Sequence, residues 1–139
     1  MIQIREMTTQ DKPRLRELYL TSRRTTFYWD DPEIMHIEDF DRDTEGECVF
    51  VAESQQSIVG FISLYVPESF IHCLFVDERF TGCGIGHLLL KEAKNQLQFP
   101  LHLKCLSRNT PALAFYEKEG WEKVHEVNVH DAYWQLIYR

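Results

Sequence analysis

Three glycines at alternate positions are the most distinctive feature of this sequence. They occur in the run RFTGCGIG, residues 79–86, between an apolar stretch and an amphipathic one. Glycine lets the backbone turn sharply and bring successive amide N–H groups close to a ligand. The same groups would begin a helix, whose dipole carries about half a positive charge at that end. The run therefore predicts a site for a phosphate or pyrophosphate, with a tight turn that binds nothing as the alternative.

Two common phosphate-binding patterns do not fit this run. The dinucleotide pattern GxGxxG requires a glycine where the chain has His87, and the P-loop requires a Gly-Lys pair, which the chain lacks. The run instead resembles the R/QxxGxG/A signature of the GCN5-related N-acetyltransferase (GNAT) superfamily, matched by Arg79, Gly82 and Gly84. In that superfamily the loop cradles the pyrophosphate of acetyl-CoA.

A second segment, residues 109–121, supports this resemblance. Its sequence NTPALAFYEKEGW is similar to the family pattern N-x(4)-A-x-x-F-Y-x-x-x-G-F, with Ala114 next to the aromatic pair and Trp121 in place of Phe. Within the superfamily the chain most resembles small bacterial acetyltransferases with a Gly-Cys-Gly-[Ile/Val]-Gly loop. The resemblance covers essentially the whole chain. It implies an acetyl-CoA-dependent N-acyltransferase that moves the acetyl group directly to a primary amine.

The resemblance also implies which residues contact acetyl-CoA. They lie on the apolar stretch before the glycine run, in the run itself and in the second segment. These residues are Leu74, Phe75, Val76, Arg79, Thr81, Gly82, Cys83, Gly84, Ile85, Gly86, His87, Asn109, Ala112, Phe115 and Tyr116. In the family a backbone N–H of residues 74–76 polarises the thioester carbonyl. A bulge in the same strand, expected here near Phe75 and Val76, opens a slot for the pantetheine arm.

Tyr116 is the expected general acid, because the family places this hydroxyl next to the sulfur of CoA. A phenol has an ordinary pKa of about 10, above that of a thiol at about 8.5, and is protonated at neutral pH. It can therefore hydrogen-bond to, or protonate, the departing thiolate. The alternative is that Tyr116 only packs in the core with Phe115, as aromatic pairs usually do.

The residue that deprotonates the attacking amine stays open. An alkylammonium group has an ordinary pKa of about 10 and must lose a proton before it attacks. Glu68 and His72 are the foremost candidates, His102 and Glu33 also qualify, and a chain of water molecules is the main rival. A covalent route through a cysteine is disfavoured, because no histidine is obviously arranged to activate a thiol.

The charge of the chain is uneven and bears on the acceptor. The net charge is −7, and residues 30–47 hold nine acidic residues against one base, Arg42. In the family the first helices form one wall of the acceptor site, so an acidic wall predicts a cationic small-molecule amine. The expected substrate contacts are Phe27, Tyr28, Trp29 and Glu33. The alternatives are a solvated acidic loop, a protein N-terminal or lysine acetyltransferase, and a non-catalytic acyl-CoA-binding module.

Composition limits the remaining possibilities. A chain of 139 residues with 44% hydrophobic and 27% charged residues predicts one domain, residues 1–139. There is neither a long apolar run nor a signal-peptide pattern, so we expect a cytoplasmic protein without a membrane partner. The negative charge disfavours nucleic acid as a partner. The four scattered cysteines predict free thiols, and the histidine spacing predicts no metal site. Either a monomer or a homodimer is expected.

Hydrophobic periodicity indicates the elements that position these residues. Strands are predicted at residues 2–5, 48–52, 58–64, 71–76, 101–106, 121–129 and 133–138. Helices are predicted from about 13 to 25, over a short stretch from 31, from 85 to 97 and from 109 to 118. The expected fold is α/β and GNAT-type. It is a mixed, mainly antiparallel sheet of six to seven strands flanked by about four helices, with a splayed parallel pair of strands 4 and 5.

Overall fold

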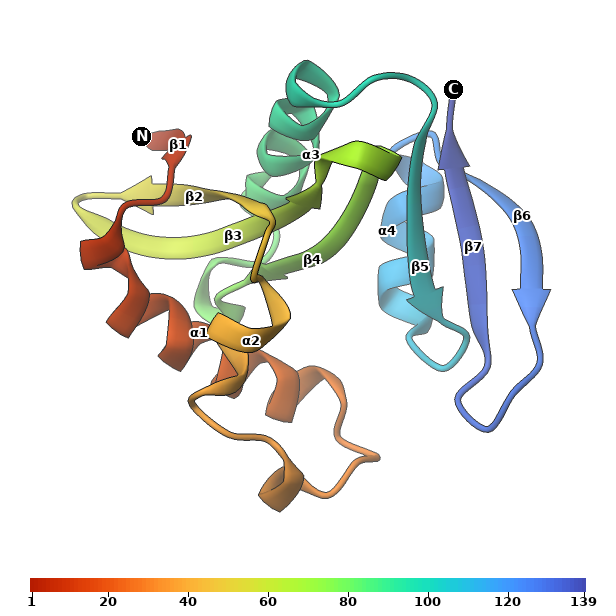
Figure 1. The fold of residues 1–139 in the computed structure, drawn as a ribbon, viewed down its shortest axis with the longest axis horizontal. Coiled ribbons are helices and arrows are strands. Elements are labelled where there is room, and N and C mark those ends of the chain that lie inside the picture. The colour runs from red at the N-terminus through yellow and green to blue at the C-terminus, as the bar shows by residue number, and fades with distance from the viewer.

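Seven strands form one mixed sheet in the order β1-β2-β3-β4-β5-β7-β6 (Figure 1). The computed structural model describes residues 1–139. The strands are β1 (Ile2–Glu6), β2 (Cys48–Ser54), β3 (Ser57–Tyr65), β4 (Phe70–Val76), β5 (Leu101–Leu106), β6 (Glu122–Val127) and β7 (Tyr133–Tyr138). All neighbouring strands are antiparallel except β4 and β5, which are parallel. The predicted sheet and its parallel pair are confirmed.

The four α-helices are α1 (Lys12–Thr26), α2 (Asp39–Asp43), α3 (Ile85–Gln96) and α4 (Thr110–Lys118). The helix predicted from Asp31 is wrong, because that stretch forms only the short 3-10 turn Pro32–Ile34. In this stretch only Met35 is buried, while Ile34 and Ile37 are exposed, whereas the fully buried Phe40 anchors α2. No helix of the chain has both the length and the apolar character needed to cross a membrane.

Two hydrophobic clusters occupy the two faces of the sheet. Along β2 the side chains alternate, with Phe50 and Ala52 in one cluster and Val49 and Val51 in the other. The first cluster contains the buried residues of α3 and α4, and the second contains those of α1 and α2. Helices therefore cover both faces, with α1 and α2 on the side opposite α3 and α4 (Figure 1).

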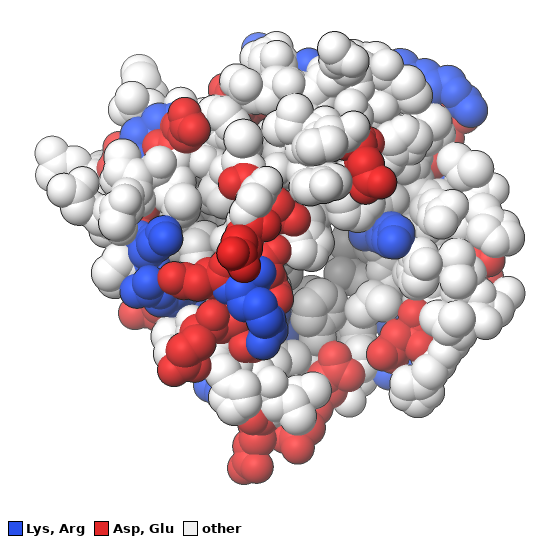
Figure 2. All heavy atoms as spheres, viewed as in Figure 1, with Lys and Arg blue, Asp and Glu red and all other residues white.

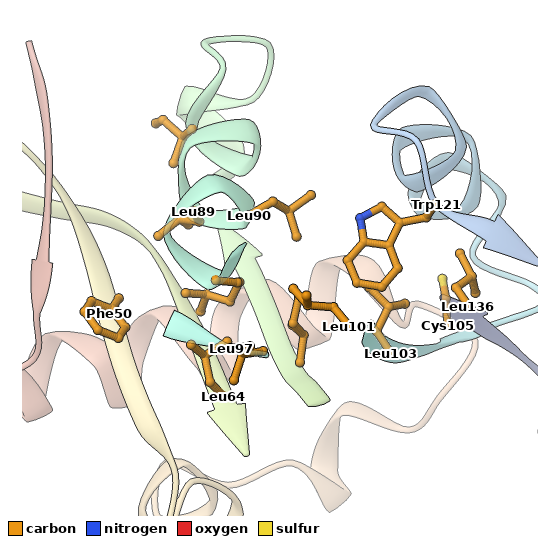
Figure 3. Packing of buried hydrophobic residues seen from close by; sticks show 14 of the residues in the cluster. Phe50, Leu64, Leu89, Leu90, Leu97, Leu101, Leu103, Cys105, Trp121 and Leu136 are labelled. Carbon is orange, nitrogen blue, oxygen red and sulfur yellow. The ribbon is translucent and has the colours of Figure 1, made fainter. Parts of the chain in front are cut away.

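The larger cluster joins the two halves of the sheet. Leu90 of α3 and the indole of Trp121 extend toward each other beside Leu101 and Leu103 of β5 (Figure 3). Leu90 is 1% exposed, whereas Leu88 is half-buried. The apolar face of α3 therefore includes Leu90 and is directed toward Trp121.

The parallel strands β4 and β5 separate after a short paired stretch. β4 and β5 are paired only at Phe70 with His102 and at Ile71 with Leu103. On the other side of β4, Ser63 opposes Cys73 but Leu64 opposes Ile71, so His72 is an extra, bulged residue. The bulge expected near Phe75 and Val76 therefore lies earlier, at His72. Because a bulge bends its strand, it helps to carry the rest of β4 away from β5.

Candidate active site

Two backbone donors of β4 face the slot that the splay opens. The amide of Asp77 donates to the carbonyl of Val59 at 2.8 Å. This bond shows which of the opposed residues of β3 and β4 are hydrogen-bonded to each other. Hydrogen bonding alternates along an antiparallel ladder, so the amides of Leu74 and Val76 point toward β5. β5 no longer pairs with β4 at this level. These amides are therefore placed to donate to a ligand in the slot.

Two cavities adjoin at this slot. The glycine-loop cavity, between the start of α3 and α4, has a volume of about 590 Å³. The α1-side cavity, bordered by the end of α1 and by β4 and β5, has a volume of about 630 Å³. Both cavities are lined by Leu74, Val76, Thr81, Pro111, Ala112 and Tyr116. A ligand in the slot would therefore contact Tyr116 and could reach from one side of the sheet to the other.

The glycine loop presents unused donors at the start of α3. Gly82 and Gly84 have left-handed φ angles of +81° and +79°, and nothing lies within 4 Å of a Cβ built on either. The first helical bond runs from the amide of Leu88 to the carbonyl of Gly84 at 3.1 Å. The amides of residues 85–87 therefore form no backbone hydrogen bond. Open space in front of free amides suits a phosphate group.

The mouth of this cavity is closed on one side by contacts between α3 and α4. A Cβ on Gly86 would lie 2.9 Å from Cζ of Phe115, so any larger residue would require the Phe115 ring to move. One residue later, Nδ1 of His87 lies 2.7 Å from Oε1 of Glu119. Together these contacts hold the start of α3 against the end of α4.

Arg79 and Cys83 are the two expected acetyl-CoA contacts that line neither cavity. Arg79 donates to Asp77 through Nη2 at 2.8 Å and Nε at 3.2 Å, while Arg14 donates to the same carboxylate at 2.9 Å. These hydrogen bonds raise the pKa of Arg79 and lower that of Asp77. Every other expected contact lies in the wall of one cavity or both.

Tyr116 stands in the shared wall with a free hydroxyl. Its ring packs against Phe115 and Trp121, with centroids 5.3 and 6.0 Å away. Burial, followed by the nearby thiols of Cys105 and Cys73, raises the pKa of the Tyr116 hydroxyl well above its usual range. The hydroxyl therefore stays protonated at neutral pH, as a proton donor requires.

A carboxylate that the sequence analysis missed orients His72. Nδ1 of His72 lies 2.8 Å from Oε2 of Glu47, and Oγ of Ser63 donates to the same carboxylate, which is only 11% exposed. An ionised carboxylate only accepts hydrogen bonds, so Nδ1 carries a proton, and in the neutral ring Nε2 then has the lone pair. His72 lines the α1-side cavity, where such a lone pair could accept a proton.

The other candidate bases lie elsewhere. Glu68 belongs to the exposed turn before β4, Glu33 to the exposed turn after α1, and His102 points outward from β5. None of the three lines either cavity, whereas the expected substrate contacts Phe27, Tyr28 and Trp29 all line the α1-side cavity. Of the acids and histidines considered, only His72 reaches the slot.

The cysteines near the slot are poor nucleophiles. Burial raises the pKa of Cys73 to about 12 and that of Cys105 to about 11. Both thiols are therefore protonated at neutral pH, which disfavours a covalent route. All four cysteines are free, and no cluster of potential metal ligands is found.

The acidic segment, residues 30–47, does not form the wall of the α1-side cavity. Three of its nine carboxylates pair with arginines: Asp41 with Arg16 at 2.8 Å, Asp39 with Arg23 at 3.1 Å and Asp43 with Arg42 at 3.0 Å. Figure 2, which has the same view as Figure 1, shows acidic and basic side chains intermixed where α1 and α2 lie. No aspartate or glutamate lines the cavity. The premise for a cationic acceptor is therefore absent from the cavity wall.

Comparisons with known proteins identify the family and the fold. A family model described as the acetyltransferase (GNAT) family matches residues 12–121. The structure is similar to that of the PaiA N-acetyltransferase of Thermoplasma acidophilum in complex with coenzyme A, with 20% identity, a TM-score of 0.82 and 100% and 99% of the two chains covered. The structure of apo YjaB of Escherichia coli is also similar, with 22% identity, a TM-score of 0.80 and 99% and 97% of the two chains covered. A third similar structure is that of Arabidopsis thaliana Naa50 in complex with a bisubstrate analogue, with 17% identity, a TM-score of 0.73 and 99% and 98% of the two chains covered. These likenesses establish the fold.

Proposed function

We propose that this chain, which belongs to the acetyltransferase (GNAT) family and is an acetyl-CoA-dependent N-acetyltransferase, acetylates the primary amine of a small molecule. The acetyl group would pass directly to the amine in the slot between β4 and β5. The observation that carries this proposal is the meeting of two cavities at Tyr116. One cavity has free amides for a pyrophosphate, and the other has room for an acceptor. We further propose that residues 1–139 form a single domain. The protein would be cytoplasmic and would act as a monomer or a homodimer.

The acetyl-CoA site is assigned to the glycine-loop cavity and the slot. The amides of residues 85–87 would bind the pyrophosphate, supported by the positive end of the α3 dipole. The amides of Leu74 and Val76 would stabilise the negative charge that develops on the thioester oxygen. Asn109 would serve mainly by fixing α4, because its side chain accepts a hydrogen bond from the amide of Ala112 at 3.3 Å.

Proton transfer is assigned to two residues. Tyr116 would donate its proton to the leaving sulfur, since burial keeps its hydroxyl protonated. His72 would accept the proton of the acceptor ammonium at Nε2, while Glu47 holds the ring through Nδ1. Glu68 is not retained as a base, because it lies in an exposed turn outside both cavities.

The test is a screen for CoA release from acetyl-CoA with small amines, N-terminal peptides and lysine peptides. Turnover with small amines, but not with peptides, is the expected result. A preference for peptides would support the alternative protein acetyltransferase. Tight binding of acetyl-CoA without turnover on any acceptor would support the non-catalytic module.

A further inference from the structure

The α1-side cavity carries positive charge where the sequence suggested negative charge. Lys104 of β5 and Arg108, just after β5, both line it, together with the proposed base His72. Figure 2 shows a hollow near the centre of this face with Lys or Arg atoms at its edge. Carboxylates occur around the hollow, and that of Glu47 lies behind His72 at 2.8 Å from its Nδ1, but none lines the cavity. A polyamine entering this cavity would meet like charge.

Arg108 differs from the other arginines of the chain. Each of the other eight donates a hydrogen bond to a carboxylate or a backbone carbonyl, whereas the guanidinium of Arg108 has no partner. It lies 5.6 Å from the ring centroid of Trp29, another residue of the same wall. The indole N–H of Trp29 is itself buried without an acceptor. An unpaired guanidinium on an aromatic wall fits a planar oxyanion.

Lys104 places a second cation beside the proposed base. The last two paired positions of β4 and β5 are Phe70 with His102 and Ile71 with Leu103. In this register the next pair would be His72 with Lys104, at the level where the strands separate. Lys104 forms no ion pair in the chain, and its ammonium lies 5.3 Å from the ring centroid of Tyr133. An anion bound by Lys104 would therefore lie across the slot from His72.

We propose that the acceptor amine carries an oxyanion, a carboxylate or a phosphate, which Arg108 and Lys104 bind while the amine lies near Nε2 of His72. This inference rests on the proposed function and adds the class of acceptor. Arg108 would bind two oxygens through its planar guanidinium, and Lys104 would contribute a point charge. The anionic group selects the substrate and orients its amine toward the slot.

The test compares acceptors that differ only in the anionic group. Amino acids are paired with their amides, aminoalkyl phosphates with the corresponding amino alcohols, and a polyamine represents cationic acceptors; CoA release is measured for each. We expect the anionic member of a pair to be preferred. The amino acid and phosphate arms then distinguish the two oxyanions.

Variants assign the preference to the two cations. Arg108→Gln should raise the KM of the anionic acceptor roughly ten- to a hundredfold, the range for losing a hydrogen bond to a charged group. It should leave the KM of acetyl-CoA unchanged and should abolish discrimination between an acid and its amide. Lys104→Gln should act in the same direction. Lys91→Gln is the control, since Lys91 is exposed on α3 and lines neither cavity.

Three results would overturn the inference. Turnover confined to neutral or cationic amines would refute it and leave the N-acetyltransferase assignment standing. A raised KM for acetyl-CoA in Arg108→Gln, with acceptor preference intact, would show that Arg108 binds the coenzyme. Absence of turnover with every acceptor class would refute the proposed function, and the inference with it.

Discussion

Replacing Tyr116 by phenylalanine removes one hydroxyl from the slot and leaves the ring in place. The hydroxyl forms no hydrogen bond within the protein, and its ring is held by Phe115 and Trp121. The free energy of unfolding should therefore change by less than about 1 kcal/mol. If the hydroxyl protonates the leaving thiolate, kcat should fall roughly a hundred- to ten-thousandfold. This loss corresponds to about 3 to 5 kcal/mol of transition-state stabilisation.

The assay for this variant separates chemistry from binding and folding. Single-turnover CoA release reports the chemical step, calorimetry reports acetyl-CoA affinity, and thermal unfolding reports stability. Tyr65→Phe is a matched control, because Tyr65 lies at the exposed end of β3 and lines neither cavity. Since the pKa of Tyr116 is raised, its ionisation should produce no loss of activity near neutral pH. A single-turnover rate equal to that of the wild type would refute the role of general acid.

Three further predictions concern other parts of the molecule. Gly84→Val should lower CoA affinity at least tenfold in calorimetry, because valine strains a left-handed φ and occupies the space before the free amides. His72→Gln should lower kcat roughly a hundredfold. Glu47→Gln should lower kcat less, and it should cause no further loss of kcat in the double variant, because Glu47 acts through His72. The pKa of Asp11 is lowered to about 2 by its hydrogen bond with Arg5. This pair should therefore contribute roughly 2 kcal/mol above pH 4, lost as pH falls toward 2, and Asp11→Asn should abolish that part of the acid sensitivity in urea titrations.

Each of these predictions can fail on its own terms. Unchanged CoA affinity in Gly84→Val would remove the pyrophosphate from the start of α3. Additive losses in the double variant of His72 and Glu47 would show that the two residues act separately. An acid transition of the same midpoint and depth in Asp11→Asn would show that the pKa of Asp11 does not differ between the folded and unfolded states.

Local features of the site were predictable from the sequence, and long-range ones were not. The glycine run and the segment around Tyr116 each form one loop or one helix, so adjacent residues determine their geometry. The contact between Glu47 and His72 depends on the register of β2, β3 and β4. No property of residues 30–47 alone distinguishes Glu47 from the other acidic residues of the segment.

The acidic segment shows the limit of arguing from composition. Nine acids in eighteen positions predict a negative surface. In the folded chain Asp41 and Asp39 meet arginines of α1 that lie 25 and 16 residues away in sequence. The unpaired cations of the site, Lys104 and Arg108, belong to a half of the chain with no net charge. Which charges cancel is decided by tertiary pairing, so net charge by segment gave the wrong sign for the cavity wall.

The cluster around Trp121 has a consequence for how wide the slot can be. Only two positions pair β4 with β5, so strand hydrogen bonds do little to fix the distance between the two halves of the sheet. Leu90, Trp121 and Leu101 fill the space between α3 and β5 and act as a spacer (Figure 3). Protein interiors are closely packed and resist compression. The width available to a pantetheine chain would thus depend on side-chain volume in the core, which packs directly against Tyr116 in the wall of the slot.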